Sequence, residues 1–215
     1  MEDKTLFINE IFYSIQGEAT NSGKPTIFIR TTGCPFRCSY CDTEYAFTEG
    51  NKFKISEIIK IIQSYKTKYI TITGGEPLSQ NNIILLMKAL IDYSYNISIE
   101  TSGLVDISNI PEKVQIIMDV KTPSSNEFTK NILNNLFLLK NSDVIKFVIG
   151  SKNDYDWSKK FISDNFLSNF SNLYFSPSHN ILKLSDIADW ILRDNLNVTL
   201  QLQFHKYIWG DIRGK

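Results

Sequence analysis

All three cysteines of the chain lie in one short segment, as Cys34, Cys38 and Cys41. An odd number of thiols in so short a stretch suits a metal centre better than disulfide bonds. A structural zinc site usually has four Cys or His ligands, whereas the only histidines, His179 and His205, are far away in sequence. An iron–sulfur cluster normally takes four thiolates, so three leave one iron open to an exogenous ligand. The segment therefore predicts a cluster with an open coordination site.

Polar residues also follow apolar, strand-like runs at five further places. These polar segments are residues 73–77, 100–103, 119–124, 176–178 and 203–206. In a parallel barrel the C-terminal ends of the strands share one rim, where active sites are built. We therefore expect the five segments to converge on one pocket.

The elements that must position these residues alternate along the chain. Short β-branched and aromatic runs predict strands at residues 7–15, 25–33, 69–75, 97–103, 115–121, 144–150, 172–177 and 198–204. Apolar residues at helical spacing predict helices at about 55–65, 83–91, 127–140, 155–166 and 184–195. This order indicates an α/β fold with a mostly parallel sheet, and about six such units would form an open, partial (βα)6-type barrel.

The charge balance gives no sign of a polyanionic partner. The 215 residues include 23 Lys and Arg against 23 Asp and Glu, so no surplus positive charge favours nucleic acid or an anionic membrane. No apolar run is long enough for a membrane span, and the charged N-terminus is unlike a signal peptide. We expect a cytoplasmic protein of a single domain, residues 1–215, that acts on a small molecule.

The cysteine spacing also carries a family resemblance. Cys34-x-x-x-Cys38-x-x-Cys41, with Tyr40 before the last cysteine, resembles the signature loop of the radical S-adenosylmethionine (SAM) superfamily. The Gly-Gly-Glu-Pro motif at residues 74–77 is similar to the second signature of that superfamily. The resemblance implies the open barrel fold of these enzymes and a [4Fe-4S] cluster whose unique iron binds SAM. It also implies cleavage of the cofactor by one electron to methionine and a 5′-deoxyadenosyl radical.

A narrower resemblance covers nearly the whole chain. Residues 12–18, 28–30, 33–34, 41–43 and 203–206 together look like the 7-carboxy-7-deazaguanine synthase family. That resemblance implies a radical SAM lyase that converts 6-carboxy-5,6,7,8-tetrahydropterin to 7-carboxy-7-deazaguanine and ammonia, in the deazapurine pathway leading to queuosine. It also implies a Mg²⁺ ion, a homodimer and a flavodoxin- or ferredoxin-type electron donor. The single domain would then be a radical SAM core with an N-terminal substrate-binding strand and a short C-terminal extension.

The same resemblance assigns roles to particular residues. The substrate-binding set is Ile15, Gln16, Gly17, Glu18, Arg30, Thr73 and His205. The cofactor-binding set is Tyr40, Gly74, Gly75, Glu76, Ser102, Lys121, Ser124, Ser176, Pro177 and Ser178. Thr43 matches the position where the family binds Mg²⁺ through a hydroxyl, while neighbouring Asp42 either attracts the ion instead or caps a turn. The planar fork of Arg30 suits bidentate binding of the pterin carboxylate, which Lys cannot reproduce.

Two other functions fit parts of the sequence. An enzyme that activates a glycyl radical enzyme would carry the same cysteine motif, but would need a groove for a protein loop and would leave Arg30 unexplained. A non-enzymatic iron–sulfur or zinc scaffold would explain the cysteines but not the polar strand ends. The last residue, Lys215, lies only ten residues after His205, so we also consider that its carboxylate reaches the pocket.

Overall fold

One nine-stranded sheet organises residues 4–215, the part of the chain that this computed structural model describes. The strands are β1 (Thr5–Ile15), β2 (Pro25–Thr31), β3 (Asn51–Lys54), β4 (Tyr69–Gly74), β5 (Asn96–Thr101), β6 (Gln115–Val120), β7 (Val144–Ile149), β8 (Leu173–Pro177) and β9 (Thr199–Leu200). Their order is β3-β1-β2-β4-β5-β6-β7-β8-β9, with β1 antiparallel to β2 and β3 and all other pairs parallel. The sheet does not close, which confirms the predicted open, partial barrel.

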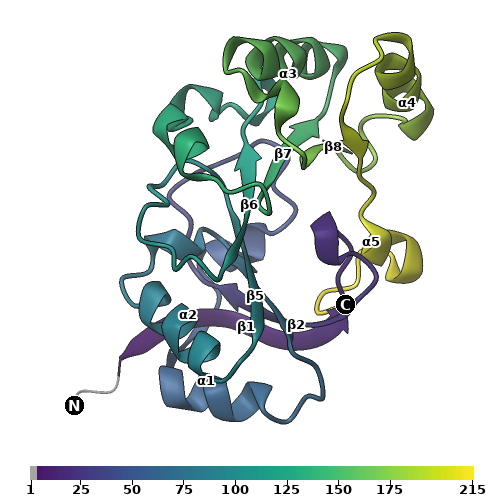
Figure 1. Ribbon diagram of the computed structural model, residues 1–215. Helices are drawn as coiled ribbons and strands as arrows, with labels where there is room; N and C mark the ends of the chain where they lie inside the picture. Colours follow the sequence, from purple (N-terminus) through teal and green to yellow (C-terminus); the bar gives the residue numbers. More distant parts are fainter. Residues whose placement is uncertain (1–3) are drawn as a thin grey trace.

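Five α-helices accompany the sheet: α1 (Ile55–Ile62), α2 (Ile83–Asp92), α3 (Lys152–Asp164), α4 (Leu184–Arg193) and α5 (Phe204–Trp209). Helices α1 to α4 follow β3, β4, β7 and β8, and Figure 1 shows them on the outside of the curved sheet. The short α5 and the C-terminus lie instead beside the end of β1 (Figure 1). Within residues 4–215 no helix is long and apolar enough to cross a membrane.

The helix predicted at 127–140 is wrong. Only two short 3-10 helices form there, Phe128–Lys130 and Leu133–Leu138. Asparagine side chains explain the difference because they compete with helical hydrogen bonds. Asn131 bonds both the N–H and the C=O of Lys121, and buried Asn135 donates to the carbonyl oxygens of Gly103 and Val105. The last strand, predicted at 198–204, is reduced to Thr199–Leu200, and Phe204 instead begins a helix that ends at Trp209.

The strands bury their apolar residues by alternation. In β2, for example, Ile27 and Ile29 are fully buried against the helices, and Ile70 and Ile72 occupy the same face of β4. Buried residues of α1 to α4 complete this core. Because side chains of a strand point alternately to the two faces, the residues between these apolar ones must face the inside of the open barrel.

Candidate active site

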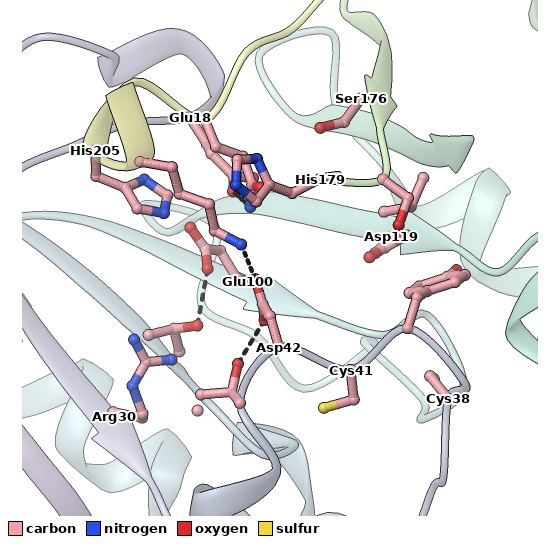
Figure 2. Close-up of a pocket in the computed structure, with 18 of the residues that line it drawn as sticks. Glu18, Arg30, Cys38, Cys41, Asp42, Glu100, Asp119, Ser176, His179 and His205 are labelled. Atoms are coloured by element: carbon pink, nitrogen blue, oxygen red, sulfur yellow. Dashed lines mark hydrogen bonds and ion pairs between the residues drawn. The ribbon is translucent and has the colours of Figure 1, made fainter. Parts of the chain in front are cut away.

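The inner face of the parallel sheet carries a ladder of polar residues. In the register of the strands, Arg30 of β2 lies opposite Thr73 of β4, and Asp119 of β6 lies opposite Lys146 of β7. These side chains and Glu100 of β5 line a cavity of about 660 Å³. Figure 2 shows Arg30, Glu100 and Asp119 converging from different strands on one space. The sheet therefore gathers cations and carboxylates that are far apart in sequence.

The cysteine loop forms one side of this cavity. Cys34, Cys38 and Cys41 all line it and are all half-buried. The loop is held by its own hydrogen bonds, in which the guanidinium of Arg37 donates to the Cys34 carbonyl (2.7 Å) and the N–H of Cys41 donates to the Cys38 carbonyl (3.1 Å). Burial raises the pKa of each of the three thiols, so a bound metal centre would be needed to keep them as thiolates.

The loop after β4 packs directly against the start of the cysteine loop. The N–H of Gly75 donates to the Thr31 carbonyl (3.1 Å) and the N–H of Glu76 to the Gly33 carbonyl (2.8 Å). A Cβ atom on Gly75 would lie 2.1 Å from the Gly33 oxygen, so only glycine permits this approach. Gly74 has a φ of +138°, which also favours glycine. The two signature motifs thus form one structural unit.

A buried ion pair lies between β7 and the loop after β1. Nζ of Lys146 lies 2.9 Å from Oε2 of Glu18, and Nε2 of Gln203 donates to Oε1 of the same carboxylate (2.8 Å). Burial opposes ionisation of Glu18, but the Lys146 ammonium outweighs it and lowers the pKa of Glu18. Conversely, burial disfavours the Lys146 cation, but the charge of Glu18 raises the pKa of Lys146. Both side chains are therefore ionised at neutral pH.

A second carboxylate, Glu100, lies in the same region but has a different environment. The hydroxyl of Thr73 donates to its Oε2 (2.8 Å), as the dashed line in Figure 2 shows. Burial and the negative charge of Glu18 raise the pKa of Glu100. The cavity therefore contains two carboxylates whose proton affinities are shifted in opposite directions, which is typical of sites that bind or move protons.

Arg30 faces the cavity next to the cysteine loop, with its guanidinium directed inward (Figure 2). Its Nε donates to Oε1 of Glu10 at 2.8 Å. The Glu10 carboxylate therefore already provides one anion for the Arg30 cation. Because Glu10 binds only Nε, the terminal Nη groups keep the fork geometry that a carboxylate ligand needs.

Polar residues beyond the cysteine loop form a separate group. The hydroxyl of Thr43 donates to Oδ1 of Asp42 (2.8 Å), and Nζ of Lys206 donates to Oδ2 (3.2 Å), as shown in Figure 2. Burial of the carboxyl group opposes ionisation, but the Lys206 charge outweighs it and lowers the pKa of Asp42 to about 2. His205 lies nearby, and burial lowers the pKa of its imidazole, which favours the neutral form.

The comparisons with known proteins agree with this geometry. The radical SAM superfamily model matches residues 28–163, more than half of the chain. Curated relatives described as 7-carboxy-7-deazaguanine synthases match far more of it. The protein of Chlorobaculum tepidum is 38% identical, with 97% of each chain covered. That of Koribacter versatilis is 40% identical over 94% of this chain and 96% of its own, and that of Methanospirillum hungatei is 41% identical over 94% and 84%.

The chain belongs to the 7-carboxy-7-deazaguanine synthase family. A crystal structure of QueE from Escherichia coli has the same fold, with a TM-score of 0.76 and 21% identity over 92% of this chain and 94% of that chain. Membership confirms the predicted superfamily and the predicted enzyme class, a radical SAM lyase of deazapurine biosynthesis. It also implies the [4Fe-4S] cluster and SAM as cofactors. The two alternative functions are set aside.

The residues present fit the cofactors of a 7-carboxy-7-deazaguanine synthase. Among residues 4–215, no three His, Cys, Asp or Glu side chains gather closely enough to hold one metal ion. Three thiols spread around a loop suit a cluster, in which each thiol binds a different iron.

Asp119 offers a further contact for a ligand. Its Oδ2 pairs with Nζ of Lys121 (3.0 Å), while its Oδ1 is buried without a hydrogen-bond partner in the described chain. That unpaired oxygen is a fitting acceptor for a hydroxyl or amino group of a ligand.

Most predicted site residues line the cavity. Those that do are Ile15, Gln16, Glu18, Arg30, Cys34, Cys38, Tyr40, Cys41, Thr43, Thr73, Gly74, Gly75, Ser102, Lys121, Ser176, Pro177, Ser178 and His205. The other three lie behind it. Gly17 backs onto His205, Ser124 bonds Asp154 of α3 through its N–H, and Glu76 is fully buried.

Both carboxylate oxygens of Glu76 already accept hydrogen bonds from the chain itself. Its Oε1 accepts from the N–H of Leu78 (3.0 Å) and the hydroxyl of Thr101 (2.9 Å). Its Oε2 accepts from the N–H and hydroxyl of Ser102 at 2.8 and 2.6 Å. Glu76 therefore ties the loop after β4 to the end of β5, while Gly74 and Gly75 line the cavity.

Sequence reasoning missed several cavity residues. Lys146 and residues 210–214 were not expected at the cavity, which they line together with Lys215. Glu100 and Asp119 lie in two of the polar segments expected to converge there, but they were given no individual role. A signal for Lys146 was present: it is a single charged residue inside the apolar strand Val144–Ile149. In a strand, such a residue points to the face opposite its apolar neighbours, so alternation would have placed it inside the barrel.

Proposed function

We propose that this protein converts 6-carboxy-5,6,7,8-tetrahydropterin to 7-carboxy-7-deazaguanine and ammonia. The observation that supports this most directly is that the Arg30 fork and the Glu18–Lys146 pair share one cavity with the three cysteines. A flat heterocycle with a carboxylate needs both a cationic fork and a set of convergent polar groups. The relatives are described as 7-carboxy-7-deazaguanine synthases, which indicates the product, and the family resemblance indicates the substrate.

Substrate recognition divides between two sides of the cavity. Arg30 binds the carboxylate through its Nη groups. Glu18, kept ionised by Lys146, accepts hydrogen bonds from the amino and ring N–H groups of the pterin. Thr73 and His205 complete the pocket. The backbone of Ile15 and Gln16 borders the ring, and Gly17 allows the His205 segment to approach it.

Cofactor binding occupies the other side. Cys34, Cys38 and Cys41 hold the cluster, which supplies the electron that cleaves SAM when both are bound. The Gly74–Gly75 backbone faces the methionine part of SAM. The other proposed contacts, for the carboxylate, ribose and adenine, are Tyr40, Ser102, Lys121, Ser176, Pro177 and Ser178, with Glu76 and Ser124 supporting them from behind.

We further propose that Mg²⁺ binds beside Thr43. Its hydroxyl and the Asp42 carboxylate provide two oxygens at the cavity wall, and Mg²⁺ commonly completes its shell with water and substrate oxygens. Lys206 pairs with the Asp42 carboxylate, so Mg²⁺ would compete with this ammonium group.

We also propose that the protein is a cytoplasmic homodimer that receives electrons from a flavodoxin- or ferredoxin-type donor. Residues 1–215 would form one radical SAM core domain with an N-terminal substrate-binding strand and a short C-terminal extension.

The test is product analysis under anaerobic conditions. Reconstituted protein is incubated with the carboxylated tetrahydropterin, SAM, Mg²⁺ and a reductant, and the products are separated by mass. We expect 7-carboxy-7-deazaguanine, equimolar ammonia and no net consumption of SAM. Cofactor cleavage without any change in the pterin would show that the substrate is wrong while leaving the superfamily assignment intact.

A further inference from the structure

Arg213, two residues before the end of the chain, is held by an unusually complete set of contacts. Its guanidinium lies over the ring of Tyr45, 4.0 Å from the ring centroid. Nη1 pairs with Glu49 (2.7 Å), Nη2 donates to the side-chain oxygen of Asn9 (2.9 Å), and Nε lies 3.4 Å from Oε2 of Glu10. The C-terminal segment is therefore attached to β1 by one side chain.

The partner that matters is Glu10, because it also holds Arg30. Oε1 of Glu10 accepts from Nε of Arg30 (2.8 Å) and from the hydroxyl of Tyr45 (3.1 Å). The side chains of Glu10 and Arg30 are only 16% and 17% exposed. Within the described chain the Nη groups of Arg30 donate no hydrogen bond, and the guanidinium points into the cavity (Figure 2). Glu10 thus fixes one edge of the guanidinium and leaves the other available.

The charges explain why a second arginine is needed. Glu10 alone would neutralise Arg30 and reduce its attraction for an anion. Arg213 shares the Glu10 carboxylate, so two cations face one anion at the edge of the cavity. Glu49, which also pairs with Arg213, is 56% exposed, so solvent screens its charge much more than that of Glu10. Arg213, whose side chain is itself 44% exposed, therefore offsets part of the Glu10 charge beside Arg30.

We propose that Glu10 and Arg213 are positioning residues for Arg30, and that through Arg30 they make the pocket select a carboxylated ligand. Glu10 orients the fork, while Arg213 offsets the charge of Glu10 and holds residues 210–215 as a cavity wall. This inference rests on the proposed function, because it takes the ligand of Arg30 to be the substrate carboxylate.

Binding to matched ligands tests it. The reconstituted protein is titrated with the carboxylated tetrahydropterin and with the same pterin bearing an uncharged carboxamide. For Arg213→Gln we expect about fivefold weaker binding of the acid, the scale of a partly exposed ion pair, and a much smaller change for the amide. Arg213→Lys should recover part of the loss. Arg193→Gln, which removes another exposed arginine on distant α4, should leave both affinities unchanged.

A double variant shows whether the effect passes through Arg30. In an Arg30→Lys background, Arg213→Gln should cost clearly less than it does in the wild type, because residues that act through each other are not additive. Equal weakening of acid and amide, or fully independent effects of the two substitutions, would mean that Arg213 only supports the wall, and the inference would be wrong.

A second readout needs no substrate. In a ¹⁵N spectrum of arginine side chains, the Nε–H signal of Arg30, assigned by its loss in Arg30→Lys, should be protected from exchange by the Glu10 carboxylate. Both Glu10→Gln and Arg213→Gln should move this signal, and Arg193→Gln should not. If the wild type binds neither pterin, the proposed substrate fails, and this spectrum still decides the link. An unchanged signal in both variants overturns the inference.

Discussion

Lys146 and Glu18 form an ion pair of 2.9 Å although 128 residues separate them in sequence. Lys146 lies in the middle of β7, and Glu18 in the turn after β1. With side chains 13% and 12% exposed, neither has enough water to compensate for the loss of the other. The pair therefore joins the N-terminal hairpin to the far half of the sheet across the cavity.

The first prediction concerns Lys146→Met, which leaves Glu18 buried without its cation. We expect a loss of about 3 kcal/mol in stability near neutral pH, the scale for a buried charge whose partner is removed. In the wild type the pKa of Glu18 is lowered, so its stabilisation is present above its unfolded value of 4.5 and is lost as the pH falls towards the folded value. In the variant, burial without a cation raises that pKa, so stability should decrease as pH rises from 5 to 7.5.

Thermal unfolding midpoints measured at several pH values under anaerobic conditions check this prediction. The informative quantity is the sign of the slope between pH 5 and 7.5, which we expect to become negative in the variant. Lys152→Met, which breaks an exposed pair with Asp156 on α3, is the matched control and should keep the wild-type slope. Parallel slopes for all three proteins would show that the ion pair does not control ionisation of Glu18.

A second prediction concerns the charge and shape of Arg30. Arg30→Lys keeps the cation but loses the fork, so binding of the carboxylated tetrahydropterin should weaken by roughly 1.5–3 kcal/mol. Iron content and cofactor cleavage without substrate should be unchanged, since Arg30 contacts no cysteine ligand. Calorimetric titration of the acid and its carboxamide measures the effect. Destruction of the cluster with substrate affinity intact would instead assign Arg30 a structural role.

The cluster assignment makes a third prediction. Replacing Cys34, Cys38 or Cys41 by Ala should abolish cleavage of SAM, because two thiolates cannot hold an open-sited cluster. Iron, sulfide and 5′-deoxyadenosine are measured after anaerobic reconstitution. Thr48→Ala, an exposed change beyond the loop, should behave as wild type. Wild-type cleavage in any of the cysteine variants would refute the assignment.

The fourth prediction tests Thr43 as a ligand of Mg²⁺. Thr43→Ala should weaken the dependence of turnover on Mg²⁺ while leaving the absorbance spectrum of the cluster intact, because the hydroxyl is not a cluster ligand. Turnover is followed across a Mg²⁺ titration in chelated buffer. The proposed site is wrong if chelated wild-type enzyme turns over as fast as enzyme supplied with Mg²⁺.

The fifth prediction uses the contact between Gly17 and His205. A Cβ atom on Gly17 would lie 2.2 Å from Nδ1 of His205 and 2.9 Å from its backbone nitrogen, so α5 must shift in Gly17→Ala. We expect destabilisation of about 1–3 kcal/mol, as for overpacking elsewhere, together with weaker substrate binding. Thermal midpoints and substrate titrations measure both. In a His205→Ala background part of the cost should disappear, and full additivity would contradict the proposed clash.

Local spacing was enough to predict the cysteine loop and the glycine motif, because each lies within a few residues. Their packing against each other needed three-dimensional information, such as the hydrogen bond from the N–H of Glu76 to the Gly33 carbonyl. The open barrel followed from the alternation of strands and helices. The helix predicted at 127–140 does not form, because the spacing of apolar residues gives no information on asparagine side chains that bond the backbone of other segments.

Glu10 and Lys146, which sequence reasoning overlooked, both take their roles from partners that are distant in sequence. Nothing near Glu10 in sequence indicates that it binds Arg30, which lies directly opposite in the antiparallel β1–β2 pair. Lys146 acquires its role from a carboxylate on another part of the chain. Thr43 and most of the proposed cofactor contacts line the cavity. Binding of Mg²⁺ and SAM by these residues stays a prediction.

The position of the C-terminal segment has a practical consequence for producing the protein. Residues 210–215 line the cavity, and the C-terminus lies beside the end of β1 (Figure 1). An affinity tag or fusion partner attached there would extend from the wall of the cavity. It could also disturb the contacts of Arg213, which hold this segment in place. The first described strand begins at the other side of the molecule (Figure 1), so purification handles belong at the N-terminus.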